Sequence, residues 1–442
     1  MFGTSGIRGP VGDVVTADLA LSVGRALGTE TDRVVVGRDP RESGRLLVDA
    51  LAAGLRETGT DVLDLGLAAT PTVARAVGWE GCDAGVSVTA SHNPPPDNGL
   101  KLWQPSGRAF DTQRRERITA RVEAEDWTLE PWDGLGSREP ADATERHVEA
   151  LTGAVDFGEH DPPGVIVDVG NGAGGVTVEA LSRLGCHVET LNASPDGRFP
   201  GRPSEPTPGN CGSLVSLVGD SDAALGIAHD GDADRMRGVA ADGTFLSGDV
   251  LLAVLATAST SAGDRVAVPV DTSLAVEDYL ADRGVETTRT PVGDVHVAAA
   301  VAAGAAFGGE PSGAWIWPGE TLCPDGPLAA VKLAELATER PLAARAAEVP
   351  TYPIERDSLR AVDKGEVMDR IRETVAERYD DVSTMDGVRV NTDEGWFLLR
   401  ASGTQPLVRV TAEAREEARA AELFETARSL AVAAGAETAE EY

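Results

Sequence analysis

Four short, widely separated segments of the chain hold side chains that could do chemistry. Residues 89–94 place a serine in a turn, and residues 230–235 place three aspartates at alternate positions. Residues 309–313 hold a carboxylate and a hydroxyl between glycines, and residues 400–405 hold an arginine with two hydroxyls. A nucleophile, a hard metal ion, a sugar and a phosphate are the natural partners of these sets. Together they predict an enzyme that acts on a phosphorylated sugar and carries a phosphoryl group on a serine.

Ser91 is the candidate nucleophile. An apolar strand over residues 85–89 leads into it, and His92, Asn93 and a run of prolines follow. That continuation cannot be helix or central strand, so Ser91 is expected on a loop, where reactive side chains are often found. A polar turn with a hydrogen-bonding serine would explain the same residues. The sequence lacks a G-x-S-x-G elbow, which disfavours a serine hydrolase.

Lys101 follows ten residues later and is one of only three lysines, against thirty-six arginines. A lysine can lose its proton when its pKa is lowered, whereas an arginine cannot. A lysine near the candidate nucleophile is therefore predicted to transfer a proton or to contact a phosphate. A solvated surface lysine is the ordinary alternative.

Asp230, Asp232 and Asp234 follow the apolar residues 224–228 and are expected at the end of a strand. Three carboxylates suit a hard cation such as Mg²⁺. A calcium loop of the EF-hand type is excluded, because its sixth position would be Arg235 instead of glycine. Arg235 would be placed to contact a phosphoryl oxygen. An acidic loop on an acidic protein remains the plain alternative.

Two further segments are predicted to bind substrate. Glu310 and Ser312 lie between glycines that allow a ligand close to the backbone, although a tight turn would also explain them. The second segment offers the guanidinium, hydroxyl and backbone N–H groups that a phosphate requires, unless it is only a hairpin with charged flanks. Its members are Arg400, Ser402, Gly403, Thr404 and Arg409.

A competing pattern occurs at residues 165–175, where G-x-G-x-x-G follows an apolar strand and Glu189 comes later. This is the fingerprint of a dinucleotide site in a nicotinamide-dependent dehydrogenase. The segment is one of three similar units, and the other two lack the glycines. It also leaves the four opening segments unexplained, so the dehydrogenase is kept only as a remote alternative.

Composition restricts the possible partners. The net charge of −33 argues against nucleic acid and against an anionic membrane surface. No apolar run is long enough to span a bilayer and no signal peptide is evident, so a cytoplasmic location is expected. The four cysteines are far apart, which disfavours a zinc site or disulfides. An acidic surface with few lysines resembles proteins adapted to a salt-rich, halophilic cytoplasm, because salt screens the self-repulsion.

The elements that must position these residues follow a repeated pattern. A strand, a helix ending at a glycine and a β-branched strand recur over residues 33–65, 165–191 and 265–288. Such units predict α/β layers with mixed, mainly parallel sheets. Beyond residue 357, alternating strands and one amphipathic helix predict an α+β unit. The expected domains are 1–143, with the serine loop; 144–245, with the metal loop; 246–355, with the sugar loop; and 356–442, with the phosphate loop.

With these motifs in this order, the chain resembles the α-D-phosphohexomutases over nearly its whole length. Residues 2–9 are similar to the N-terminal signature of that family. The resemblance implies four domains around one central cleft and a phosphorylated Ser91. It implies Mg²⁺ held by Ser91 and the three aspartates, and a sugar 1,6-bisphosphate as intermediate and activator. Arg8, Lys101 and Arg235 would surround the reacting phosphoryl group, with His92 beside it. Glu310 and Ser312 would hold the sugar, and the segment at 400–409 the other phosphate.

The sequence of the sugar loop is similar to that of archaeal members of the family assigned to phosphoglucosamine mutase. Interconversion of glucosamine 6-phosphate and glucosamine 1-phosphate is therefore expected, with phosphomannomutase or phosphoglucomutase activity as the alternative. A non-catalytic protein that binds sugar phosphates is a remote alternative. Ala314 stands where many bacterial members have a histidine, and His296 is a candidate for a substitute contact. A monomer or homodimer is expected.

Overall fold

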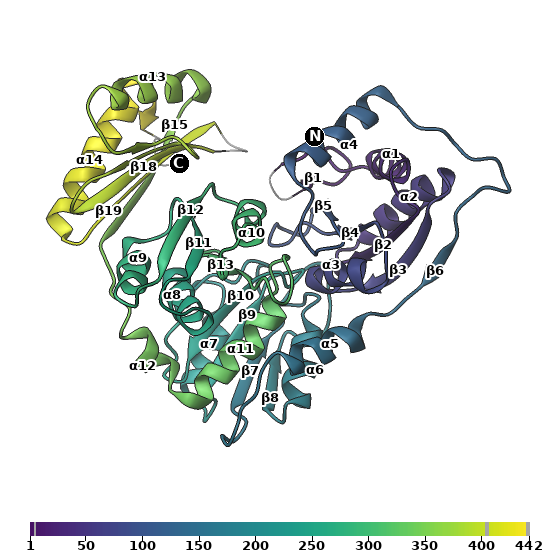
Figure 1. Cartoon of the computed structure of the whole chain (residues 1–442), viewed down its shortest axis with the longest axis horizontal. Coiled ribbons are helices and arrows are strands. Elements are labelled where there is room, and N and C mark those ends of the chain that lie inside the picture. Colours follow the sequence, from purple (N-terminus) through teal and green to yellow (C-terminus); the bar gives the residue numbers. More distant parts are fainter. Residues whose placement is uncertain (4–5, 403–405, 439–442) are drawn as a thin grey trace.

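The computed structural model describes residues 1–3, 6–402 and 406–438. These residues form four β-sheets, each built from one consecutive part of the chain (Figure 1). We call each sheet with its helices a domain and number the domains in chain order. The expected fold class, three similar α/β domains followed by an α+β domain, is confirmed. The domain boundaries at 143/144, 245/246 and 355/356 remain predictions.

The first domain has a six-stranded sheet in the order β1-β5-β4-β2-β3-β6. The inner strands are parallel, whereas β5 pairs antiparallel with both β4 and β1. Two glycines allow α1 and α2 to pack closely, because a Cβ on Gly24 would lie 2.3 Å from the Leu51 carbonyl oxygen. The elements are β1 (Ile7–Pro10), α1 (Ala17–Gly28), β2 (Arg33–Arg38), α2 (Gly44–Glu57), β3 (Asp61–Leu67), α3 (Thr70–Trp79), β4 (Ala84–Val88), β5 (Asp97–Trp103), α4 (Thr112–Ala124) and β6 (Arg138–Pro140).

The second and third domains share one large hydrophobic core, which α11 joins by packing against elements of both. Their sheets have the orders β10-β9-β7-β8 and β12-β11-β13-β14. The second consists of α5 (Thr144–Gly153), β7 (Gly164–Asp168), α6 (Gly175–Arg183), β8 (His187–Leu191), α7 (Gly212–Gly219), β9 (Leu225–His229) and β10 (Met236–Ala240). The third consists of α8 (Gly248–Ser259), β11 (Arg265–Pro269), α9 (Leu274–Ala281), β12 (Glu286–Thr290), α10 (Asp294–Ala302), β13 (Phe307–Glu310), β14 (Ala314–Ile316), α11 (Gly326–Glu339) and α12 (Leu342–Ala346).

The fourth domain has its own core and an antiparallel sheet with two long helices on one face (Figure 1). The opposite face is therefore free to turn toward the rest of the molecule. The elements are β15 (Ile354–Arg360), α13 (Lys364–Ala376), β16 (Val382–Ser383), β17 (Val388–Asn391), β18 (Gly395–Ala401), β19 (Leu407–Ala414), α14 (Glu417–Ala433) and β20 (Glu437–Thr438). In the described part of the chain, no helix combines the length and apolar character needed to cross a bilayer.

A buried polar cluster ties the first three domains together. Arg75 on α3 donates to Asp325, which caps α11, at 2.8 Å. His147 on α5 lies 3.4 Å from the same carboxylate and 2.8 Å from the hydroxyl of Thr72. Burial lowers the pKa of His147, and the Arg75 guanidinium holds the pKa of Asp325 below its ordinary value despite the opposing effect of burial. A buried ion pair therefore fixes the orientation of α3 relative to α11.

Arg75→Ala is expected to destabilise the protein by about 3 kcal/mol, because Asp325 would be left buried and unpaired. The measurement is the free energy of unfolding from urea titrations. Arg183→Ala removes an exposed arginine that pairs with Glu145 and Glu179, and should change stability much less, because solvent screens such a pair. Equal effects of the two substitutions would contradict the role of the buried pair.

Candidate active site

A cavity of 530 Å³ lies where the four domains meet. Every domain contributes to its wall, which is rich in charged side chains of both signs. The acidic members are Asp234, Asp249, Asp271, Asp294, Glu310 and Asp386, and the basic members are Arg8, Arg235, Arg356, Arg400 and Arg409. His92, Ser312 and Ser402 also line it. Such a cavity suits a small ligand that carries several charges and hydroxyls.

Ser91 follows β4 and is buried, with its backbone in the left-handed region at φ 53°. Its hydroxyl donates a hydrogen bond of 2.6 Å to Asp230 and lies 3.5 Å from Asp234. The serine loop of the first domain is thus joined directly to the turn between β9 and β10 of the second. The structure brings together the first two motifs, which lie far apart in the sequence.

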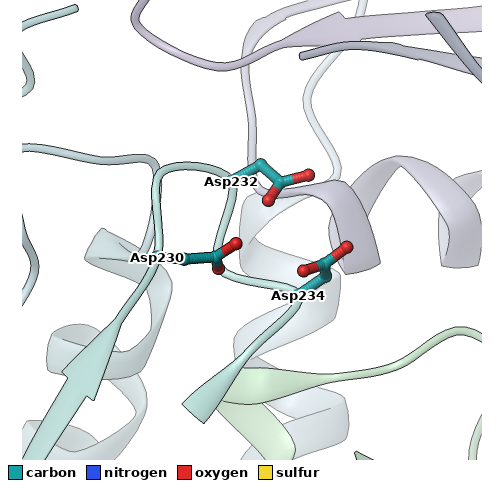
Figure 2. Close-up of side chains that lie close together, drawn as sticks. All are labelled: Asp230, Asp232 and Asp234. Atoms are coloured by element: carbon teal, nitrogen blue, oxygen red, sulfur yellow. The ribbon is translucent and has the colours of Figure 1, made fainter. Parts of the chain in front are cut away.

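Asp230, Asp232 and Asp234 converge in this turn (Figure 2). Each offers a carboxylate oxygen within 4.8 Å of the others, and all three side chains are buried. Burial and mutual repulsion raise the pKa values of Asp230 and Asp234. Hard oxygen donors in this arrangement, with the Ser91 hydroxyl beside them, fit a divalent cation such as Mg²⁺.

Lys101 on β5 is buried beside the same carboxylates. Its Nζ lies 2.8 Å from Asp232 and also donates to Asp234. Burial disfavours the charged amine, but the two carboxylates outweigh burial and raise its pKa above the ordinary value. In this structure Lys101 is therefore an ammonium, and a lowered lysine pKa, one of the possibilities considered from the sequence, is not found.

Three potentially cationic side chains, those of His92, Arg8 and Arg235, line the cavity together with Asp234. Burial lowers the pKa of His92 to about 2, and the positive charges of Arg235, Arg8 and Lys101 contribute. His92 is therefore neutral. Its Nδ1 and the Nε of Arg8 are buried and have no hydrogen-bond partner within the described ranges. These groups are available to a ligand in the cavity.

Glu310 and Ser312 lie at the end of β13 and at the start of the next turn, on the cavity wall. The backbone N–H of Gly293 donates to Glu310 at 2.7 Å, and the Ser312 hydroxyl donates at 3.3 Å. Burial and the neighbouring Asp294 raise the pKa of Glu310 to about 7. The carboxylate and hydroxyl are thus held side by side, as recognition of vicinal hydroxyls would require.

The fourth domain presents arginines to the same cavity. Arg400 on β18 and Arg409 on β19 are direct cross-strand neighbours. Arg356 on β15, which the sequence analysis did not identify, is opposite Thr411 and therefore lies on the same face of the sheet. Ser402 also lines the cavity, and its carbonyl accepts a hydrogen bond from Lys364. Gly403 and Thr404 lie outside the described residues.

His296 is partly buried on α10 and is not among the residues that line the cavity. Asp294, two residues earlier, does line it. Asp386 is a further residue that the sequence analysis missed: it accepts hydrogen bonds from Arg400 at 3.1 Å and from the backbone of Val292 at 3.0 Å. No local pattern distinguishes Asp294, Asp386 or Arg356 from surface residues, because only the tertiary structure brings them to the cavity.

The glycine-rich segment after β7 supports the metal loop. A Cβ on Gly172 would lie 2.7 Å from the Gly231 carbonyl oxygen, and the N–H of Ala173 donates to that oxygen at 3.0 Å. Glu189 is exposed on β8. The glycines are thus explained by close backbone packing against the turn that carries the aspartates. No dinucleotide is needed to account for them.

Glu310→Gln is expected to change how stability depends on pH. The pKa of about 7 is above the ordinary 4.5, so the folded protein retains a proton that the unfolded chain releases between these values. The stability contributed by Glu310 is fully present below about pH 4.5 and is lost as the pH rises through about 7. Relative to Glu310→Gln, the wild type should lose roughly 1–3 kcal/mol between about pH 5 and pH 8.

The measurement is the free energy of unfolding in urea at both pH values. Glu123→Gln, at an exposed position of α4, controls for the loss of one negative charge. If the wild type and Glu310→Gln gave parallel pH profiles, Glu310 would not titrate in this range.

Comparisons with known proteins agree with this geometry. Family models of the phosphoglucomutase/phosphomannomutase α/β/α domains I, II and III match residues 1–129, 145–243 and 247–352, and the C-terminal domain model matches residues 328–430. The probable phosphoglucosamine mutase of Methanopyrus kandleri is 45% identical over 433 residues, covering 96% of this chain and 95% of that protein. The one from Methanothermobacter thermautotrophicus is 44% identical, covering 97% of each.

Among solved structures, a phosphoglucomutase/phosphomannomutase family protein from Burkholderia thailandensis superposes with a TM-score of 0.87 at 30% identity, covering 99% of both chains. Shared sequence and shared architecture thus extend over all four domains. The chain belongs to the phosphoglucomutase/phosphomannomutase family and is a phosphohexomutase.

Proposed function

We propose that this protein moves a phosphoryl group between O6 and O1 of a hexosamine phosphate, interconverting glucosamine 6-phosphate and glucosamine 1-phosphate. The observation that carries the proposal is the placement of Ser91. Its hydroxyl is buried 2.6 Å from Asp230 and 3.5 Å from Asp234. Asp234 and His92, the residue after Ser91, line the cavity to which the fourth domain contributes its arginines. A serine that carries a phosphoryl group and a separate phosphate site are the two parts that a phosphosugar mutase needs.

Asp230, Asp232 and Asp234, with the Ser91 oxygen, would hold Mg²⁺. The cation would neutralise charge on the phosphoryl oxygens, which is the main requirement of phosphoryl transfer. Lys101 and Arg235 would donate hydrogen bonds to those oxygens, and Arg8 would approach them from β1. Neutral His92, whose Nδ1 has no partner within the described residues, would serve as a hydrogen-bonding partner.

In the proposed cycle, a sugar hydroxyl attacks phosphoserine 91, its bond to phosphorus forms, and the bond to Ser91 Oγ breaks. The attacking hydroxyl loses its proton and the departing serine oxygen takes one up, so that a sugar 1,6-bisphosphate and free Ser91 result. The Lys101 ammonium would keep its charge and stabilise the phosphoryl oxygens. The bisphosphate turns over, and the phosphate at its other end transfers back to Ser91. Added sugar 1,6-bisphosphate would act as an activator because it phosphorylates Ser91 directly.

Glu310 and Ser312 would hold the sugar through hydroxyls that both orientations share. Arg400, Arg409 and the Ser402 loop, including Gly403 and Thr404, would hold the phosphate that is not reacting. Arg356 joins this set because it lies on the same face of the sheet. His296 remains a candidate contact for a bound sugar, although Asp294 lies nearer to the cavity.

Two observations favour an amino sugar. The relatives from Methanopyrus kandleri and Methanothermobacter thermautotrophicus carry the name probable phosphoglucosamine mutase. In addition, the third domain lines the cavity with Asp271, Asp294 and Glu310, and carboxylates favour a sugar that bears an ammonium group. Mannose and glucose phosphates are the alternative substrates, since the family models bear the names phosphoglucomutase and phosphomannomutase.

Ser91→Ala is expected to lower mutase turnover by a factor of about 10³ or more, because no phosphoryl carrier remains. Ser87→Ala is the matched control: Ser87 is also buried, on β4, and accepts a hydrogen bond from Trp103 away from the cavity. It should retain turnover. Turnover near the wild-type rate in Ser91→Ala, with bisphosphate present, would rule out Ser91 as the carrier.

The substrate is tested by phosphorus NMR with Mg²⁺ and catalytic sugar bisphosphate. Glucosamine, glucose and mannose 1-phosphates are supplied separately, and the glucosamine ester should be converted fastest. Assays at low and high KCl test adaptation to a salt-rich cytoplasm, because screening of the −33 charge should raise the activity. Faster conversion of the mannose or glucose ester would overturn the choice of sugar while leaving the reaction class intact.

A further inference from the structure

The serine loop rests on a buried arginine that the proposed cycle does not use. Arg41 has a fully buried side chain and pairs with Asp39 at 2.9 Å. Its guanidinium donates to backbone carbonyl oxygens along the loop, namely those of Ser91 at 2.9 Å, Asn93 at 2.6 Å, Pro94 at 2.6 Å and Asp97 at 2.8 Å. Because a guanidinium is a planar fork of donors, a single side chain can gather several carbonyls in a defined geometry.

The same ion pair also reaches the amide of Ser91. Asp39 accepts a hydrogen bond of 2.8 Å from the Thr89 hydroxyl, and the oxygen of that hydroxyl accepts the Ser91 N–H at 2.8 Å. The carbonyl of Ser91 is bound directly by Arg41 and the amide is bound through Thr89 and Asp39. Both backbone polar groups of Ser91 therefore depend on one buried ion pair.

The second domain closes over this arrangement. The Ser204 hydroxyl donates to the Ser91 carbonyl at 2.9 Å, so that oxygen has two donors from two domains. The ring of Phe199 lies 5.0 Å from the Arg41 guanidinium. Gly197 packs so closely that a Cβ there would lie 2.4 Å from the Cα of Arg41. The arginine is thus enclosed on the side of the second domain as well as within the first.

This enclosure has a clear consequence for Ser91. A φ of 53° is unfavourable for a residue with a side chain, so it persists only where its surroundings hold it. That conformation places Oγ 2.6 Å from Asp230. If Ser91 relaxed to an extended conformation, its hydroxyl would leave the carboxylates.

We propose that Arg41, paired with Asp39 and assisted by Ser204, is a positioning residue that holds Ser91 in the left-handed conformation required for phosphoryl transfer. The inference rests on the proposed function of Ser91 as phosphoryl carrier. Arg41 touches neither the cavity nor the predicted sugar and phosphate contacts. Its loss should therefore slow transfer to and from Ser91 without weakening the binding of sugar phosphate.

The test measures transfer of a phosphoryl group from glucose 1,6-bisphosphate to Ser91 in a single turnover, followed by intact mass, and the steady-state kcat and KM. Arg41→Lys keeps the charge but loses the fork of donors. It should slow the transfer and kcat by about 10- to 100-fold, since small misplacement of a reacting group has effects of this size. KM for the sugar phosphate should stay within about twofold of the wild type.

Ser204→Ala removes one hydroxyl and should slow transfer by roughly threefold to tenfold. In the double variant, the fold-reduction of the transfer rate should be smaller than the product of the two single fold-reductions. The effects overlap because both side chains act on the same carbonyl. Arg56→Lys is the matched control: Arg56 donates to the Gly136 carbonyl in the same domain, away from the cavity. It should leave the transfer rate unchanged.

Crystal structures of the wild type, Arg41→Lys and Ser204→Ala separate this inference from the proposed function. The inference expects Ser91 to leave the left-handed region in Arg41→Lys and its Oγ to lose contact with Asp230. An unchanged Ser91, or a loss of stability with no change in transfer rate, would overturn it. If Arg41→Lys does not fold, the transfer rate of Ser204→Ala and the conformation of Ser91 in its crystal structure test the inference instead. A wild-type Ser91 that bisphosphate never phosphorylates would instead overturn the carrier role, and the geometry of the variants would still test the positioning.

Discussion

The structure depends on one electrostatic constraint, the burial of three carboxylates on a single turn. Asp230, Asp232 and Asp234 lie within reach of one cation and are nearly inaccessible to solvent. Charges in such a place are costly unless donors and opposite charges surround them. Within the described residues, the turn itself provides the positive charge of Arg235 and the Arg235 N–H, which donates to Asp230 at 3.2 Å. Most of the compensating groups therefore come from the first domain, and the two domains must be docked for the turn to exist in this form.

The first domain supplies those groups from three separate elements. Lys101 on β5 pairs with two of the aspartates, and the Ser91 hydroxyl after β4 donates to the third. Thr70, at the start of α3, donates its hydroxyl to Asp232 at 2.6 Å and its N–H to the carbonyl of the same residue at 2.9 Å. A helix N-terminus favours negative charge, so α3 is oriented to stabilise the turn. The Arg75–Asp325 pair, one turn further along α3, then fixes that helix against the third domain.

The sequence identified the residues whose role is local and missed those whose role is set by the fold. Ser91 and the aspartates could be predicted because a turn after a strand and alternate spacing place such side chains at one edge of a sheet. Asp39 and Arg41 follow a strand in the same way, but they act on a loop some fifty residues distant, which no periodicity indicates. Arg356 required the register of β15 against β19. The core shared by the second and third domains likewise depends on α11, and the sequence of α11 does not predict which elements it packs against.

The three lysines of this chain occupy positions where the choice of lysine instead of arginine has a structural reason. In a chain where arginine has replaced lysine almost everywhere, each remaining lysine makes a specific contact. Lys332 donates to the Ala154 carbonyl and lies over the Trp317 ring, and Lys364 donates to the Ser402 carbonyl beside the phosphate loop. Lys101 sits between two carboxylates in a site with almost no access to solvent. A compact ammonium fits such a space, whereas a planar guanidinium would need more room and more acceptors than this turn offers. Lys332 and Lys364 are half-buried, whereas Lys101 is buried. Asp232 and Asp234 raise the pKa of Lys101, so this position holds a compact ammonium that keeps its charge.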